Sequence, residues 1–137
     1  MISSICTAII GAITGLTGVK TVGAWAGDVE VLLKIPQSLP GLYLVYPGAT
    51  FEPGPVAMGT VNVDTVMQFQ ILLIVSSLKS PSSAAITAWG IMESVRTQLI
   101  GRQILTYNKL WPVNEELVFS EAGLLVYGLN YSLDARV

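Results

Sequence analysis

The sequence contains no histidine and only one cysteine, Cys6. Without imidazole there can be no Ser-His-Asp triad, no Cys-His pair and no His-ligated metal site. One cysteine makes neither an internal disulfide nor a zinc site built from cysteines. The only directly adjacent acids, Glu115 and Glu116, are more typical of a solvated loop pair than of a general acid and base, and no carboxylates have cation-binding spacing. We therefore expect no enzyme activity, no cofactor and no metal.

Charge is also scarce. Seven basic and nine acidic residues make up 12% of the chain, whereas about 25% is usual, and 52% of the residues are hydrophobic. The basic residues are scattered singly and the net charge is −2, so no nucleic-acid partner is indicated. So little charge cannot cover an ordinary monomer surface, which favours assembly with other subunits.

The 137 residues are enough for one domain, spanning 1–137. Residues 1–19 are expected to form an N-terminal helix, because apolar residues recur every three or four positions at Ile2, Ile5, Ile9, Ile13 and Leu16. Cys6 falls on this apolar side, as a buried, unreactive thiol. The opposite side is small and uncharged. Three interpretations stay open: a helix between the core and a neighbouring subunit, a short membrane helix, or a helix facing water through Ser and Thr.

A connector over residues 20–27 and a short helix from Val29 to about Ile35, capped by Asp28, are expected next, with a strand as the alternative for 29–35. Residues 42–46 and 60–76 are predicted strands; in the second, apolar side chains alternate from Met67 to Val75. Further strands are predicted over residues 110–113, continuing at 118–119, and over residues 124–133. The expected fold is α+β, with an antiparallel sheet of about four strands and helices packed on one face.

The strongest local signal is Ser80-Pro81, a capping serine followed by proline at the first helical position. It predicts the main helix over 80–100, ending at Gly101. The expected apolar stripe is Ala85, Ala88, Trp89, Met92, Val95 and Leu99. Glu93 and Arg96 lie one turn apart and are expected to form an ion pair.

Residues 47–59 are expected to form a long loop, because they contain three prolines and three glycines. A solvated connector and a contact surface are both possible. The apolar residues in this segment favour contact with a neighbouring subunit. The expected interface residues are Phe51, Glu52, Val56, Met58, Glu93 and Arg96.

The order of several short motifs resembles a known family. The motifs are Trp25-x-Gly27-Asp28, Val45-Tyr46-Pro47-Gly48, Ser80-Pro81, Leu99-Ile100-Gly101, Leu110-Trp111-Pro112-Val113 and Gly123-x-Leu125-Val126-Tyr127-Gly128-Leu129-Asn130-Tyr131. Together they are similar to the Mu-like small tail proteins of contractile-tailed phages and prophages, which resemble tail terminator (tail completion) proteins. The resemblance spans roughly residues 25–133 and carries no catalytic residues.

This resemblance implies a homo-oligomeric ring, usually a hexamer, that ends tube and sheath growth and meets the neck or connector. The implied location is the head-proximal end of a virion tail, after assembly in the host cytoplasm. A head–tail joining protein is the main alternative, and a membrane-associated assembly subunit anchored by residues 2–19 is a further one; the favoured interpretation has no membrane partner.

Overall fold

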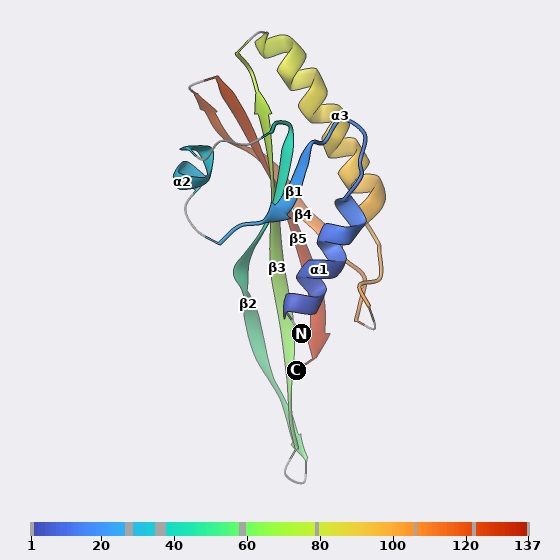
Figure 1. Cartoon of the computed structure of the whole chain (residues 1–137). Coiled ribbons are helices and arrows are strands. Elements are labelled where there is room, and N and C mark those ends of the chain that lie inside the picture. Colours follow the sequence, from blue (N-terminus) through green and yellow to red (C-terminus); the bar gives the residue numbers. More distant parts are fainter. Residues whose placement is uncertain are drawn as a thin grey trace.

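The computed structural model describes residues 2–26, 29–34, 38–57, 60–78, 80–105, 107–121 and 123–136. Its elements along the chain are α1 (Ile2–Ile13), β1 (Thr21–Ala24), α2 (Val29–Lys34), β2 (Gly41–Ala57), β3 (Thr60–Ser76), α3 (Pro81–Leu99), β4 (Trp111–Glu121) and β5 (Leu124–Arg136). The sheet has five strands in the order β1-β2-β3-β5-β4 (Figure 1). Only β1 and β2 are parallel; the other neighbours are antiparallel.

The fold is therefore mixed α and β with a mostly antiparallel sheet, and the expected four strands become five. The additional strand is β1, within the segment expected to be a connector. Its flanks donate hydrogen bonds to β2 and to the residue just before it, from Trp25 N to Leu44 O over 2.9 Å and from Lys20 N to Pro40 O over 2.8 Å. A strand of four residues is too short to show an alternating pattern, so only pairing with β2 reveals it.

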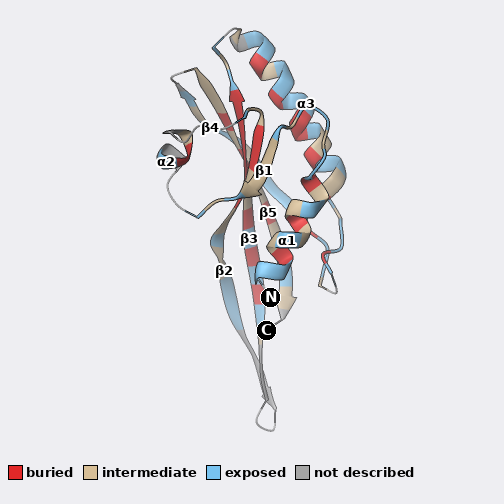
Figure 2. Cartoon of the chain, in the orientation of Figure 1, coloured by how far each residue is buried: buried red, intermediate tan, exposed pale blue. Residues whose placement is uncertain are grey.

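The main core lies between the sheet and the two longer helices. Ile5, Ile9 and Ile13 of α1 and Val95 and Leu99 of α3 are fully buried against the odd-numbered residues of β3, such as Ile71 and Leu73. Figure 2 shows these buried positions along the facing sides of the elements. The period-two and helical spacings in the sequence put these side chains on the correct faces.

The expectation that all helices lie on one face is wrong for α2. Leu32 of α2 packs with Leu72, Ile74 and Val126, which form a second, smaller cluster. Leu72 and Ile74 alternate with Ile71 and Leu73, so this cluster lies on the opposite face of the sheet. We call this side, away from α1 and α3, the open face.

The first helix is shorter than expected. α1 ends at Ile13 rather than near residue 19, and Gly15 and Gly18 follow with φ of 85° and 86°. These positive φ values are left-handed turn conformations that end a helix. On the exposed side of α1, the Thr7 hydroxyl donates to the Ser3 carbonyl over 2.9 Å, within the helix itself.

The helix start at Ser80-Pro81 is confirmed. The Ser80 Oγ accepts from the Ser83 N–H over 3.2 Å, and α3 ends at Leu99. The expected stripe was partly wrong, because Trp89 is 52% exposed and Ile91 is buried instead. The buried side of α3 consists of Ala84, Ala88, Ile91, Met92, Val95 and Leu99.

The prediction of a loop over residues 47–59 is wrong for residues 47–57, which belong to a strand. β2 continues to Ala57 and pairs with β3, so the segment is one side of a long hairpin that extends beyond α1 (Figure 1). Register shifts between Val45 and Gly48 and between Pro53 and Val56 accommodate the irregular backbone. Because β1 covers only residues 41–44 of β2, the rest is an edge strand, where proline is tolerated.

Candidate interaction surface

The distal part of the hairpin, residues 48–57 of β2 and 60–68 of β3, is called the arm; at its base Met67 still belongs to the core. Phe51 and Glu52 lie on the arm and are exposed, Phe51 to 60%. Phe51 pairs with Thr65, two positions beyond the buried Met67, so it stands where the covered core ends. Val56 pairs with Val61 in the backbone register, and Met58 lies outside the described residues.

The other two expected interface residues lie elsewhere, on α3. Glu93 and Arg96 are exposed, and Arg96 pairs with Glu115 of β4 instead of forming the expected pair with Glu93. The Arg96 Nε donates to both Glu115 carboxylate oxygens over 3.0 and 2.9 Å. These hydrogen bonds and the Glu115 charge raise the pKa of the Arg96 guanidinium. The pair links α3 to β4 and, because Arg96 is exposed, contributes little stability.

Glu115 and Glu116 are therefore not a loop pair. Both belong to β4, where Glu115 pairs with Leu129 and Glu116 pairs with Gly128. Adjacent residues in a strand point to opposite faces, so Glu115 turns toward α3 and Glu116 toward the open face. The two carboxylates consequently do not act as one site.

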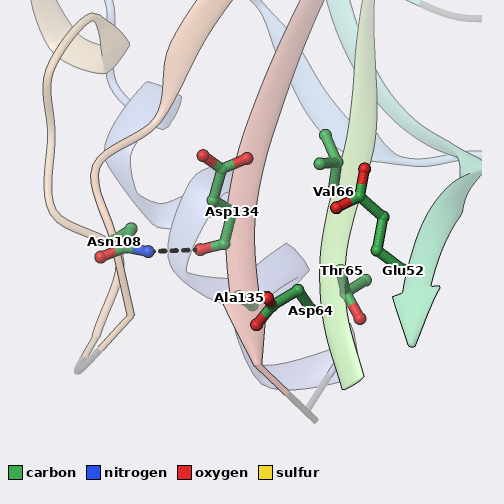
Figure 3. A pocket seen from close by; sticks show the side chains of 7 residues that line it. All are labelled: Glu52, Asp64, Thr65, Val66, Asn108, Asp134 and Ala135. Atoms are coloured by element: carbon green, nitrogen blue, oxygen red, sulfur yellow. Dashed lines mark hydrogen bonds between the residues drawn. The ribbon is translucent and has the colours of Figure 1, made fainter. Parts of the chain in front are cut away.

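Two shallow cavities lie on the sheet near the arm. The larger, of about 430 Å³, is lined by Glu52, Asp64, Thr65, Val66, Asn108, Asp134 and Ala135 (Figure 3). The smaller, of about 310 Å³, is lined mainly by amides and apolar groups: Pro47, Gln68, Phe69, Gln70, Val113, Asn114, Asn130 and Tyr131. Amide side chains there donate and accept hydrogen bonds but do not transfer protons.

Groups suited to catalysis are sparse in the part of the chain that the structure describes. No cluster of three or more His, Cys, Asp or Glu side chains there could hold a metal ion. Cys6 is half-buried, and burial raises the pKa of its thiol, which keeps it protonated and a poor nucleophile. No helix among the described residues has the length and apolar character needed to cross a membrane.

The most exposed apolar side chains include a run on β4. Trp111, Val113, Leu117 and Val118 are each between 41% and 59% exposed. β4 is the last strand of the sheet, so its outer backbone groups have no strand beside them among the described residues. An exposed apolar edge strand is typical of a site for association. The sequence offered one signal for this edge, Pro112 at its start, but did not mark Leu117 and Val118 as exposed.

No family model matches the sequence, and no curated protein is a match either. Solved structures do match. One chain from the "Virion of native gene transfer agent (GTA) particle" has a TM-score of 0.54 and 17% sequence identity, over 95% of this chain and 86% of that chain. At this identity the likeness shows a shared fold, and it spans nearly the full length of both chains.

Proposed function

We infer that the protein is a structural virion protein, a tail terminator whose subunits form a ring, most simply a hexamer. The ring would cap the tail tube and sheath and meet the neck or connector. The observation that carries this proposal is the fold shared, over 95% of this chain, with a chain of a phage-like virion. The order of sequence motifs supports it independently, because these motifs resemble small phage tail proteins.

The surface of the molecule fits a subunit better than a monomer. Charge is 12% of the chain, and large apolar side chains are exposed on the arm and along β4. A closed ring hides such surface in repeated contacts between different patches. The proposed contact residues are Phe51, Glu52 and Val56 of the arm, together with Met58. Glu93 and Arg96 are left out, because Arg96 is held by Glu115 within the chain.

Two measurements test the proposal. Native mass spectrometry of the purified chain, alone and with tail tubes, should show a closed oligomer, most simply six copies. Antibody labelling of intact particles should then place the chain at the head-proximal end of the tail. Label at the connector, away from the tube end, would favour a head–tail joining protein. A chain that stays monomeric in both samples and is absent from particles contradicts a virion role.

A further inference from the structure

The sheet has two free edges. On one side β1 covers only Gly41–Leu44 of β2, so β2 has no outer neighbour over the rest of its length among the described strands. On the other side β4 has no outer neighbour among the described strands. Unpaired edges readily add a strand from another chain. We call residues 48–52 the β2 edge. Residues 102–105 and 107–111 lead into β4 and pair with each other, Gln103 with Lys109 and Arg102 with Leu110; we call this segment the β4 edge.

Resting on the proposed ring, we propose that a second copy of this chain joins these edges. The β2 edge of one copy lies against the β4 edge of the next, so that the two sheets meet side by side. The two patches are different surfaces. The contact is therefore heterologous, as a ring larger than two requires, whereas a β4-to-β4 contact would end at a dimer.

Strand direction fits this join. β2 is antiparallel to β3, β3 to β5, and β5 to β4. β2 and β4 therefore run in opposite directions within one subunit. When the next copy is placed beside β4 by rotation about a ring axis along the strands, its β2 meets β4 antiparallel. In this arrangement β2 and β4 of neighbouring copies lie as antiparallel neighbours.

The register brings complementary groups to the same level. In the register of the sheet Gly48 pairs with Gln68, Gln68 with Ser132, and Ser132 with Trp111. Gly48 and Trp111 therefore lie at the same height along the strands. Thr50 lines up through Val66 with Asp134, whose carbonyl accepts from the Asn108 Nδ2 over 2.9 Å. Residues 48–52 therefore stand level with residues 108–111 across the sheet. A ring closes without a rise along its axis, so levels on the two edges meet.

The chemistry of the two edges is complementary at this level. The β2 edge presents Phe51 and Glu52, with Asp64 directly opposite Glu52 on β3. The β4 edge presents Trp111, 55% exposed, beside Lys109, which is also exposed. Phe51 pairs with Thr65 on the face covered by α1 and α3, whereas Trp111 pairs with Ser132 on the open face, so the two rings do not meet. The join would place the Glu52 carboxylate near the Lys109 ammonium.

Arg102 adds a second positive charge to the β4 edge. It is exposed, and it lies beside the start of β4 because its carbonyl accepts from the Leu110 N–H over 2.9 Å. Asp134 lines a cavity with Lys109 and offsets part of the charge there. With Arg102 and Lys109 together, the β4 edge remains basic opposite the acidic β2 edge.

Cross-linking tests the contact without removing these groups. In a Cys6→Ser background, one chain carries Thr50→Cys and another carries Val113→Cys; both positions are exposed and adjoin the proposed contact. A short bismaleimide should link the two chains when they are mixed and link neither chain to itself. A chain with both cysteines should give a ladder of covalent oligomers that stops at the ring size.

Charge reversal tests the pairing directly. Glu52→Lys and Lys109→Glu should each raise the concentration needed for half-assembly by about tenfold, and the double variant should restore assembly. Glu93→Lys is the control, because Glu93 is exposed on α3 and belongs to neither edge. Equal impairment by Glu93→Lys, or no rescue in the double variant, would overturn the pairing.

The outcomes separate this inference from the proposed function. Closed oligomers that neither cross-link between positions 50 and 113 nor respond to the reversals overturn the edge contact and leave the ring. Cross-linked rings that do not attach to tail tubes keep the edge contact and contradict the tail-terminator function. A chain that stays monomeric, alone and on particles, contradicts both.

Discussion

Tyr131 carries a hydroxyl group buried without a hydrogen-bond partner among the described residues, and its side chain is 2% exposed. Burial raises the pKa of Tyr131 to about 12; the Glu115 charge adds to this rise and the Arg96 charge opposes it. The hydroxyl therefore stays protonated in the folded chain at a pH where it ionises in the unfolded chain. Its ring still supplies one of the largest buried side chains of the core.

We expect the stability of the protein to fall as pH rises from about 10, the pKa of an unfolded tyrosine, to about 12. In this interval the unfolded chain binds fewer protons, so the free energy of unfolding decreases with pH. Tyr131→Phe should lose less stability there and should be at least as stable at pH 7, because an unpartnered hydroxyl is removed. Urea unfolding at pH 7 and pH 11 measures both. Parallel pH dependences of variant and wild type would contradict the assignment.

Gly128 is required by close packing in the sheet. A Cβ atom there would lie 2.9 Å from the Val118 Cγ2 and 3.0 Å from the Gln70 Nε2. We expect Gly128→Val to destabilise the fold by about 1–3 kcal/mol, the usual cost of overpacking. Gly90→Ala is the matched control: nothing lies within 4 Å of its Cβ, so it should stabilise α3 by about 0.5–1 kcal/mol. Chemical unfolding measures both, and equal effects would argue against the close approach.

Among the elements, α3 depends most clearly on a local motif. The Ser80 Oγ caps the helix by accepting from the Ser83 N–H, and proline follows at the first helical position. Three buried residues from this helix, Ala88, Val95 and Leu99, then meet the sheet. The cap therefore supports the element that carries much of the core.

We expect Ser80→Ala to lower the free energy of unfolding by about 1 kcal/mol, since one backbone N–H loses its acceptor. Ser82→Ala is the control, because Ser82 is exposed within α3 and should change stability by less than about 0.5 kcal/mol. Thermal or urea unfolding distinguishes them. Equal losses would show that serine content rather than the cap matters.

The arm shows how an element acquires its role from its neighbours. Pro53 and Pro55 lie within β2 and would be damaging in a central strand. They are tolerated because no strand pairs with the outer side of β2 beyond residue 44 among those described. Proline has no N–H to donate, and proline on an edge strand limits unselective strand pairing. The same edge is thus protected and still available for a specific partner.

The whole molecule combines one well-covered core with surfaces left bare at its periphery. α1 and α3 cover one face of the sheet, and α2 covers part of the other. The arm extends beyond α1 (Figure 1). Phe51 on the arm and Trp111 on β4 are more than half exposed. This distribution fits a subunit whose folding is complete without its partners and whose contacts lie at the edges.

The double variant Phe51→Ser with Met58→Ser should leave the monomer folded and impair ring formation or tail capping. Phe51 is already exposed in the monomer, so its loss should change the free energy of unfolding by no more than about 0.5 kcal/mol. Val31→Ser, exposed on α2, is the control and should do neither. Thermal unfolding and native mass spectrometry report the two effects. Wild-type assembly would refute the contact role, and loss of folding would place the arm residues in the core.

Patterns within short stretches of sequence determined the elements whose residues decide their own conformation. An amphipathic first half followed by a run that is apolar on both faces marked β3 over 60–76, and Ser80-Pro81 marked the start of α3. The tertiary structure alone decided the rest. The arm prolines are tolerated because no described strand lies outside β2 at that point. The strand β1 forms only because it pairs with β2. Arg96 pairs with Glu115, nineteen positions away, instead of with Glu93. Trp89 shows the same limit: its spacing fits the stripe, yet Ile91 takes the buried place because the sheet fixes how α3 is rotated. Local chemistry sets backbone conformation, whereas pairing and burial depend on residues brought together only by the fold.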